Sequence, residues 1–139
     1  MSKSFSLFIN FNGECREALA YYGGIFQAEA TDIMTYSQIP PSDGYSPPES
    51  DKDRIMYASL PIFGTNVMFS DSPSDTPTIV GDNIAPTLST DDKAELTRIF
   101  SALKDGGEVY MDLAPTFWSQ LYGSVKDKYG VVWQLSHEG

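Results

Sequence analysis

Apolar and polar residues alternate along several short stretches of the chain, the pattern of strands with one face in a core. The first stretch runs from Phe5 to Phe11, and its inward positions are Phe5, Leu7, Ile9 and Phe11. Similar runs, bounded by turn residues, predict seven more strands. These span residues 28–36, 55–63, 66–71, 82–90, 109–113, 121–127 and 131–136.

Two other stretches repeat apolar residues at helical spacing. The stripe of the first is Cys15, Leu19, Tyr22 and Phe26, and that of the second is Leu96, Ile99, Phe100 and Leu103. Asn12 is the expected N-cap of the first helix and Ser89 that of the second, because short polar side chains satisfy free backbone N–H groups there. Gly106 or Gly107 is expected to end the second helix.

The predicted order is therefore strand, helix and three strands, written twice. The first βαβββ module covers residues 1–71, a connector rich in Pro, Ser and Asp covers 72–80, and the second module covers 81–139. One such module cannot bury a sheet face alone, so the two are expected to pair as one α+β domain.

The segment from Gln38 to Asp53 has no apolar period and is rich in Pro, Gly, Ser and Asp. Such a segment is either a solvated connection between strands or a flap over a pocket. The pattern leaves both readings open.

Composition narrows the function classes. The chain has 139 residues, a net charge of −10, one His and one Cys. The acidic balance argues against nucleic acid and anionic membranes, since phosphate binding needs clustered Lys and Arg. No apolar run reaches the roughly 20 residues that span a bilayer. With no export signal and no cysteine pair, the expected location is cytoplasmic.

Three segments resemble the PhnB-like branch of the glyoxalase/bleomycin-resistance group, within the vicinal oxygen chelate superfamily that also includes dioxygenases. The first is FNGECREALAYYGGIF, residues 11–26; the second is IMYASL followed by MFSD, residues 55–60 and 68–71. The third and most specific is TFWSQLYGSVKDKYGVVW, residues 116–133. Gln27 and Ser119 stand where the family usually has Gly.

The resemblance implies a mixed eight-stranded sheet curled around a cavity, with helices on its convex side, and a homodimer. It also implies a divalent metal held by one side chain from each of four strands, the first and fourth of each module. The matching positions here are Ser6, Tyr57, Ala85 and Gln134. These are poor ligands, because such metals want imidazole or carboxylate. We therefore expect no metal and no cofactor, and these residues are equally well read as ordinary inward-facing strand positions.

A cavity of this kind would have aromatic walls and few polar anchors, which suits a flat or amphipathic small molecule. The candidate lining residues are Phe8, Tyr57, Phe69, Trp118 and Gln134. Phe117 and Trp118 line the cavity mouth or close the core between the modules. The alternatives are a lyase, isomerase or oxygenase of the same superfamily, and a dimeric structural or regulatory module. Methyl transfer has no support, since the glycine-rich loop of a Rossmann fold is missing.

The remaining candidates for chemistry have ordinary structural interpretations. Cys15 is read as a small core residue rather than a reactive thiol, and His137 as a solvated terminal residue. The Asp91-Asp92 pair is read as helix-capping charge. Asp71 and Asp127 are expected to accept hydrogen bonds from neighbouring turns.

Overall fold

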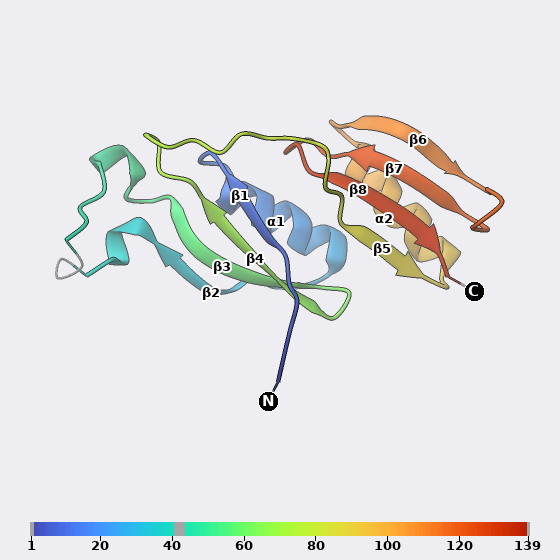
Figure 1. Cartoon of the computed structure of the whole chain (residues 1–139), viewed down its shortest axis with the longest axis horizontal. Coiled ribbons are helices and arrows are strands. Elements are labelled where there is room, and N and C mark those ends of the chain that lie inside the picture. Colours follow the sequence, from blue (N-terminus) through green and yellow to red (C-terminus); the bar gives the residue numbers. More distant parts are fainter. Residues whose placement is uncertain (1, 41–43, 139) are drawn as a thin grey trace. The chain divides into compact units, whose positions relative to one another are not determined.

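The computed structural model describes residues 2–40 and 44–138. The chain divides into two compact units, one ending at Thr78 and the other beginning at Ile79. Each contains one strand, one helix and three further strands in that order (Figure 1). The repeated βαβββ organisation is therefore confirmed. The eight strands form two mixed four-stranded sheets, one in each unit, and neither sheet is closed.

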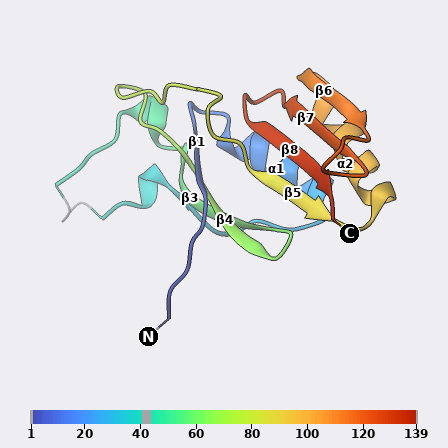
Figure 2. The same ribbon diagram turned by 45° about the vertical axis from the view of Figure 1, so that its right-hand side comes forward.

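The first unit has its strands in the order β1-β4-β3-β2. Strand β1 pairs parallel with β4, while β3 pairs antiparallel with both β4 and β2. Its helix α1 packs against β3 and β4, on one face of the sheet (Figure 2). The bounds are β1 Phe8–Phe11, α1 Cys15–Phe26, β2 Thr31–Thr35, β3 Ile55–Ile62 and β4 Thr65–Asp71.

The second unit repeats this arrangement in the order β5-β8-β7-β6. Strands β5 and β8 are parallel, and the other neighbours are antiparallel. Helix α2 packs against all four strands of its own sheet. The bounds are β5 Thr87–Thr90, α2 Lys93–Lys104, β6 Glu108–Ala114, β7 Tyr122–Lys126 and β8 Val132–His137.

The buried faces of both helices follow the predicted stripes closely. Leu96, Ile99, Phe100 and Leu103 of α2 are all buried, as expected. In α1 the stripe turns slightly, because Ile25 is buried while Phe26 is half-exposed. Phe11 and Phe69 stack with their ring centroids 6.2 Å apart beneath this helix, and Tyr22 contacts both rings. Apolar burial of this kind is what joins each helix to its sheet.

Both predicted helix caps are wrong. Asn12 does not cap α1; its side chain exchanges two hydrogen bonds with the backbone of Thr78. Ser89 does not cap α2, because β5 continues through Thr90 and Asp92 accepts the N–H of Glu95 instead. A carboxylate at this position satisfies the free N–H and complements the helix dipole.

Two strands are shorter than the alternation predicts. Strand β1 begins at Phe8 rather than at Phe5, and Phe5 is 97% exposed. Strand β5 begins at Thr87 rather than at residue 82, since Pro86 has no N–H to donate to a neighbouring strand. The segment from Gln38 to Asp53 contains the end of a short 3-10 helix, Tyr36–Gln38, and all of a second, Glu49–Asp51, while residues 41–43 lie outside the described part.

Within the described ranges, no helix is long and apolar enough to cross a membrane.

Candidate functional site

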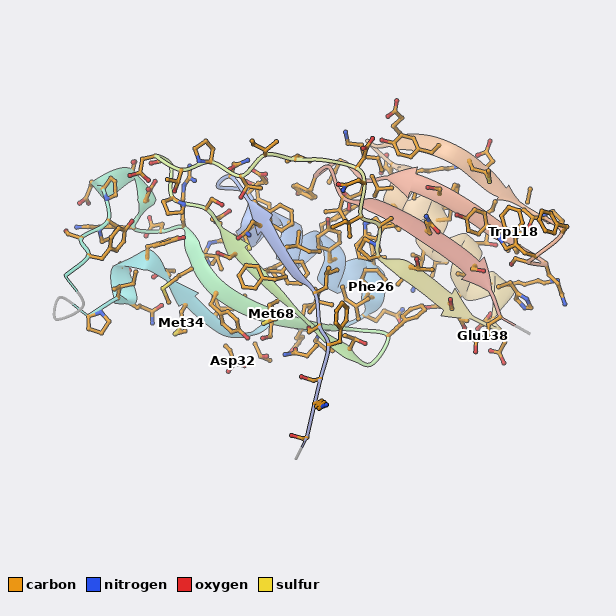
Figure 3. The ribbon with its side chains drawn as sticks, in the orientation of Figure 1. Phe26, Asp32, Met34, Met68, Trp118 and Glu138 are labelled. Carbon is orange, nitrogen blue, oxygen red and sulfur yellow. The ribbon has the colours of Figure 1, made fainter. Side chains whose placement is uncertain are left out.

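The face of the first sheet that points away from α1 carries a mixture of apolar and hydroxyl side chains. Ala58 and Leu60 of β3 face the core and are fully buried, so Tyr57 and Ser59 project from the opposite face, where Tyr57 is half-buried and Ser59 is 1% exposed. Met34 of β2 is paired with Tyr57, and Met68 of β4 is paired with Ser59. Figure 3 shows both methionines on this sheet. We call this surface the open face of the first sheet.

A chain of hydrogen bonds orders the polar groups of the open face. The Tyr57 hydroxyl lies 3.0 Å from Ser59 Oγ, and the Asn66 side-chain amide donates to the same Ser59 oxygen. The Ser6 hydroxyl donates to the Asn66 backbone carbonyl at 2.6 Å. These hydrogen bonds fix the position of the Tyr57 hydroxyl.

Among the candidate pocket residues, Phe8 and Tyr57 lie in the first unit, and Phe8 pairs with Met68. Phe69 belongs to the same unit, but it is fully buried beneath α1 and contacts Phe11 and Tyr22. It therefore cannot line the open face. The prediction that Phe69 lines the pocket chose the wrong residue of a neighbouring pair. Successive residues of a strand point to opposite faces, and Met68 is the one that faces outward.

The other two candidates, Trp118 and Gln134, lie in the second unit. Gln134 stands on β8, with Thr87 of β5 on one side and Ser124 of β7 on the other. Leu135 is fully buried against α2, so Gln134 projects from the opposite, polar face. Trp118 lies between β6 and β7 and is 56% exposed (Figure 3).

The four positions matched to family metal ligands carry no imidazole or carboxylate. Ser6 precedes β1 and donates its hydroxyl to a carbonyl, and Ala85 precedes β5 with no side-chain donor at all. Tyr57 lies on β3, the third strand of its module, whereas the resemblance implies the fourth strand. The fourth strand of the first unit is β4, and its residue equivalent to Gln134 is Met68, because each pairs with the first residue of the parallel neighbouring strand. In residues 2–40 and 44–138, no three His, Cys, Asp or Glu residues cluster as potential metal ligands.

Three buried carboxylates tie loops to strands instead of forming a site. Asp71 accepts N–H groups from Gly13, Cys15 and Ile55. Asp127 accepts the N–H groups of its own turn, as predicted, and also the indole N–H of the buried Trp133 at 2.8 Å.

The third, Asp51, is fully buried by its neighbours. The backbone N–H of Ser74 lowers the pKa of Asp51, with the Ser74 hydroxyl and Arg54 acting in the same direction. Nothing in the spacing of the sequence pointed to this contact, since Asp51 lies in the segment read as a solvated loop.

The single cysteine has the structural role that the sequence indicates. Cys15 is fully buried at the start of α1. Burial raises the pKa of its thiol far above the ordinary value, and the Asp71 carboxylate adds to that rise. The thiolate is the reactive form, so both burial and the raised pKa disfavour reaction of Cys15.

The single histidine is less exposed than predicted. Nε2 of His137 lies 3.2 Å from the Asp91 carbonyl oxygen. Its Nδ1 atom is buried and has no hydrogen-bond partner within the described chain. His137 is the last residue of β8 and lines a hollow of the second unit. Its position near the end of the sequence gave no sign of this.

Known proteins of similar sequence and fold cover nearly the whole chain. A family model described as 3-demethylubiquinone-9 3-methyltransferase matches residues 3–136. Protein YjdN of Escherichia coli K12 is 29% identical over 141 residues, covering 94% of this chain and 92% of that protein.

Several solved structures share the fold of this chain. Protein PA1353 of Pseudomonas aeruginosa has a TM-score of 0.88 at 33% identity, covering 99% of this chain and 98% of that one. A Bacillus cereus protein described as a putative 3-demethylubiquinone-9 3-methyltransferase, PhnB protein, has a TM-score of 0.80 at 24% identity, covering 98% and 100%. The fosfomycin resistance protein FosX of Listeria monocytogenes shares the fold, with a TM-score of 0.65 at 11% identity over 98% and 93%. The chain therefore belongs to the family described as 3-demethylubiquinone-9 3-methyltransferase.

Proposed function

We propose that this protein binds a small, flat or amphipathic molecule on the open face of the first sheet, and that it does so without a metal ion. The observation that carries the proposal is the chemistry of that face. It presents an oriented phenol, two methionines and the half-exposed ring of Phe8, with hydroxyl and amide groups beside them. Apolar and aromatic surface with a few fixed polar groups is the usual composition of a small-molecule site.

The residues at the four positions matched to family metal ligands support the metal-free part of the proposal. A divalent metal would need imidazole or carboxylate ligands, and the matched positions supply a hydroxyl, a phenol, a methyl group and an amide.

Metal analysis tests this part directly. The protein is purified without chelator, incubated with Zn²⁺, Ni²⁺ or Mn²⁺, freed of excess ion and assayed for metal per chain. We expect far less than one ion per chain and no change in melting temperature on adding chelator. Stoichiometric metal, or a chelator-sensitive melting temperature, would contradict the proposal and favour a lyase, isomerase or oxygenase.

Ligand binding is tested with N-phenyl-1-naphthylamine, a neutral amphipathic fluorophore. We expect saturable binding that Tyr57→Ala weakens by about tenfold, since truncation removes most of the aromatic contact area. Tyr110→Ala is the control, because Tyr110 is a 45% exposed strand tyrosine that belongs to the second unit. Equal affinity in both variants would remove the open face as the site.

Methyl transfer is not proposed, although the family description names it. The first unit runs strand, helix, strand with no glycine-rich loop between β1 and α1, so no cradle for a dinucleotide or a related methyl donor is formed. S-adenosylmethionine should therefore leave the melting temperature unchanged.

We also propose that the protein is a homodimer and that it is cytoplasmic. Phe5, Ile79 and Ile84 are each more than 70% exposed in the single chain, and burial of such side chains commonly stabilises a dimer. Light scattering after size exclusion is expected to give twice the mass of one chain; a mass equal to one chain would contradict the dimer. The one cysteine is buried and free, which suits a reducing compartment.

A further inference from the structure

The second unit contains a hollow that is lined by residues of that unit alone. Its volume is about 600 Å³. It is formed by the start of α2, the segment between β6 and β7, and the end of β8. The lining residues are Lys93, Pro115, Thr116, Phe117, Trp118, Ser119, Gln120 and His137. A volume of this size accommodates a small organic ligand.

The segment that bears the two aromatic residues is fixed by its own hydrogen bonds. Thr116 Oγ1 accepts the backbone N–H groups of Trp118 and Ser119, and the Thr116 N–H donates to the Ser119 carbonyl. The Ser119 hydroxyl donates to the carbonyls of Leu121 and His137, which anchors the segment to β8. Because the segment is already ordered, it loses little conformational entropy when a ligand docks on it.

Two aromatic side chains of the hollow are exposed, although the backbone that carries them is ordered. Phe117 is 96% exposed and Trp118 is 56% exposed. Phe117 contacts Trp118 edge-on at 4.8 Å, and Trp118 contacts Tyr122 in the same way at 5.3 Å. These edge contacts orient the Trp118 ring and leave part of its face exposed, where a planar molecule can stack. Figure 3 shows Trp118 where the chain turns from β6 to β7.

The charged group of the hollow is an ammonium without a partner. Lys93 is exposed at the start of α2, and no hydrogen bond or ion pair engages its side chain in the described ranges. Several other cations of this acidic chain are paired, as in Lys52 with Glu49 and Arg98 with Glu95. No Asp or Glu lines the hollow.

His137 forms part of the wall of the hollow, and its Nε2 atom lies 3.2 Å from the Asp91 carbonyl oxygen. Lys93 is the one Lys or Arg among the lining residues, so anion recognition in the hollow depends on it.

We propose that this hollow is a binding site for a small planar aromatic carboxylate, with its ring against Trp118 and Phe117 and its carboxylate against the Lys93 ammonium. The site is separate from the open face, and the proposal does not rest on the function proposed above. Apolar stacking supplies most of the affinity, and the half-exposed ion pair supplies the preference for an anion.

The experiment compares 1-naphthoate with the neutral 1-naphthamide by ¹⁵N–¹H NMR titration of the full chain. We expect both probes to shift the amide signals of residues 116–120, and naphthoate to bind roughly five- to tenfold more tightly. Lys93→Gln should abolish that difference. Lys104→Gln, which removes the same charge from the other end of α2, should preserve it. Trp118→Ala should weaken both probes.

Three results would overturn the proposal. The first is equal affinity of the two probes for the native chain. The second is an equal effect of Lys93→Gln and Lys104→Gln, which would reduce the preference to overall charge. The third is a set of shifts outside the lining residues, or no shifts at all, as expected if a second copy covers the hollow. None of these results touches the metal analysis or the fluorophore binding, so the two proposals fail independently.

Discussion

The Asp71 carboxylate should be among the most sensitive single groups for the stability of the first unit. It is 1% exposed at the end of β4. One oxygen accepts the N–H groups of Gly13 and Cys15 at 2.8 and 3.0 Å, and the other accepts that of Ile55 at 3.0 Å. It thus joins the start of α1, the start of β3 and the end of β4. The variant Asp71→Asn changes almost no volume and removes only charge and one acceptor.

The expected cost follows from these three contacts. If the new amide oxygen faces Gly13 and Cys15, two charge-assisted hydrogen bonds become neutral, which costs about 1 kcal/mol each. The amide NH₂ then faces the Ile55 N–H, so two buried donors oppose each other, at a further cost of about 1–3 kcal/mol. The reversed amide leaves more donors opposed. The total is about 3–5 kcal/mol, a large part of the usual stability of a small domain.

Urea unfolding followed by far-UV circular dichroism measures this loss, and amide hydrogen exchange locates it. Exchange at Cys15 and Ile55 should accelerate more than exchange in β7 or β8. Asp75→Asn is the control, because Asp75 is an exposed acid just beyond the same strand, and its change should lie within about 0.5 kcal/mol. A loss below about 1 kcal/mol in Asp71→Asn, or unchanged exchange at both amides, would refute the reasoning.

Three further predictions concern α1 and its surroundings. Gly24→Ala should raise the free energy of unfolding by up to about 1 kcal/mol, because its Cβ would meet no atom within 4 Å; Gly23→Ala should lower it, because its Cβ would lie 2.8 Å from the Ala28 carbonyl oxygen. Cys15 should resist a thiol reagent in the native chain at pH 8 and react fully in urea; fast native labelling would contradict its burial. Burial raises the pKa of Tyr36, so its phenol ionises more readily in the unfolded chain; stability should fall above pH about 10, and less so in Tyr36→Phe.

The sequence alone predicts the order of elements and the buried side of most of them. Alternation and helical spacing are local properties, and they depend on which side chains avoid water. The exceptions have identifiable causes. Phe5 continues the alternation of β1 yet is 97% exposed, three residues before the strand begins. Gln27 ends α1 at a φ of 54°, a conformation that favours glycine and that composition does not reveal.

Features that depend on contacts between distant residues are not predictable from spacing. The cap of α1 comes from Asp71, and the burial of Asp51 comes from Ser74; neither pair is close in sequence. The same limit applies to the candidate sites. Tyr57 was found because its strand resembles a family motif, whereas Lys93 and His137 become neighbours of Trp118 only after the second unit has folded. Phe69 was assigned to the wrong face because one residue of register reverses the direction of a side chain.

The parallel pairing of the first and last strands in each unit has a consequence for biosynthesis. Phe8 needs Met68 as its neighbour, and Thr87 needs Gln134, so neither sheet is complete until nearly all of its unit has been translated. Contacts this far apart in sequence form slowly. We expect a nascent chain to hold β1 unpaired until β4 leaves the ribosomal tunnel. The second sheet is complete only when β8 has been made, so a stalled or truncated product that lacks β8 leaves β5 without its partner strand.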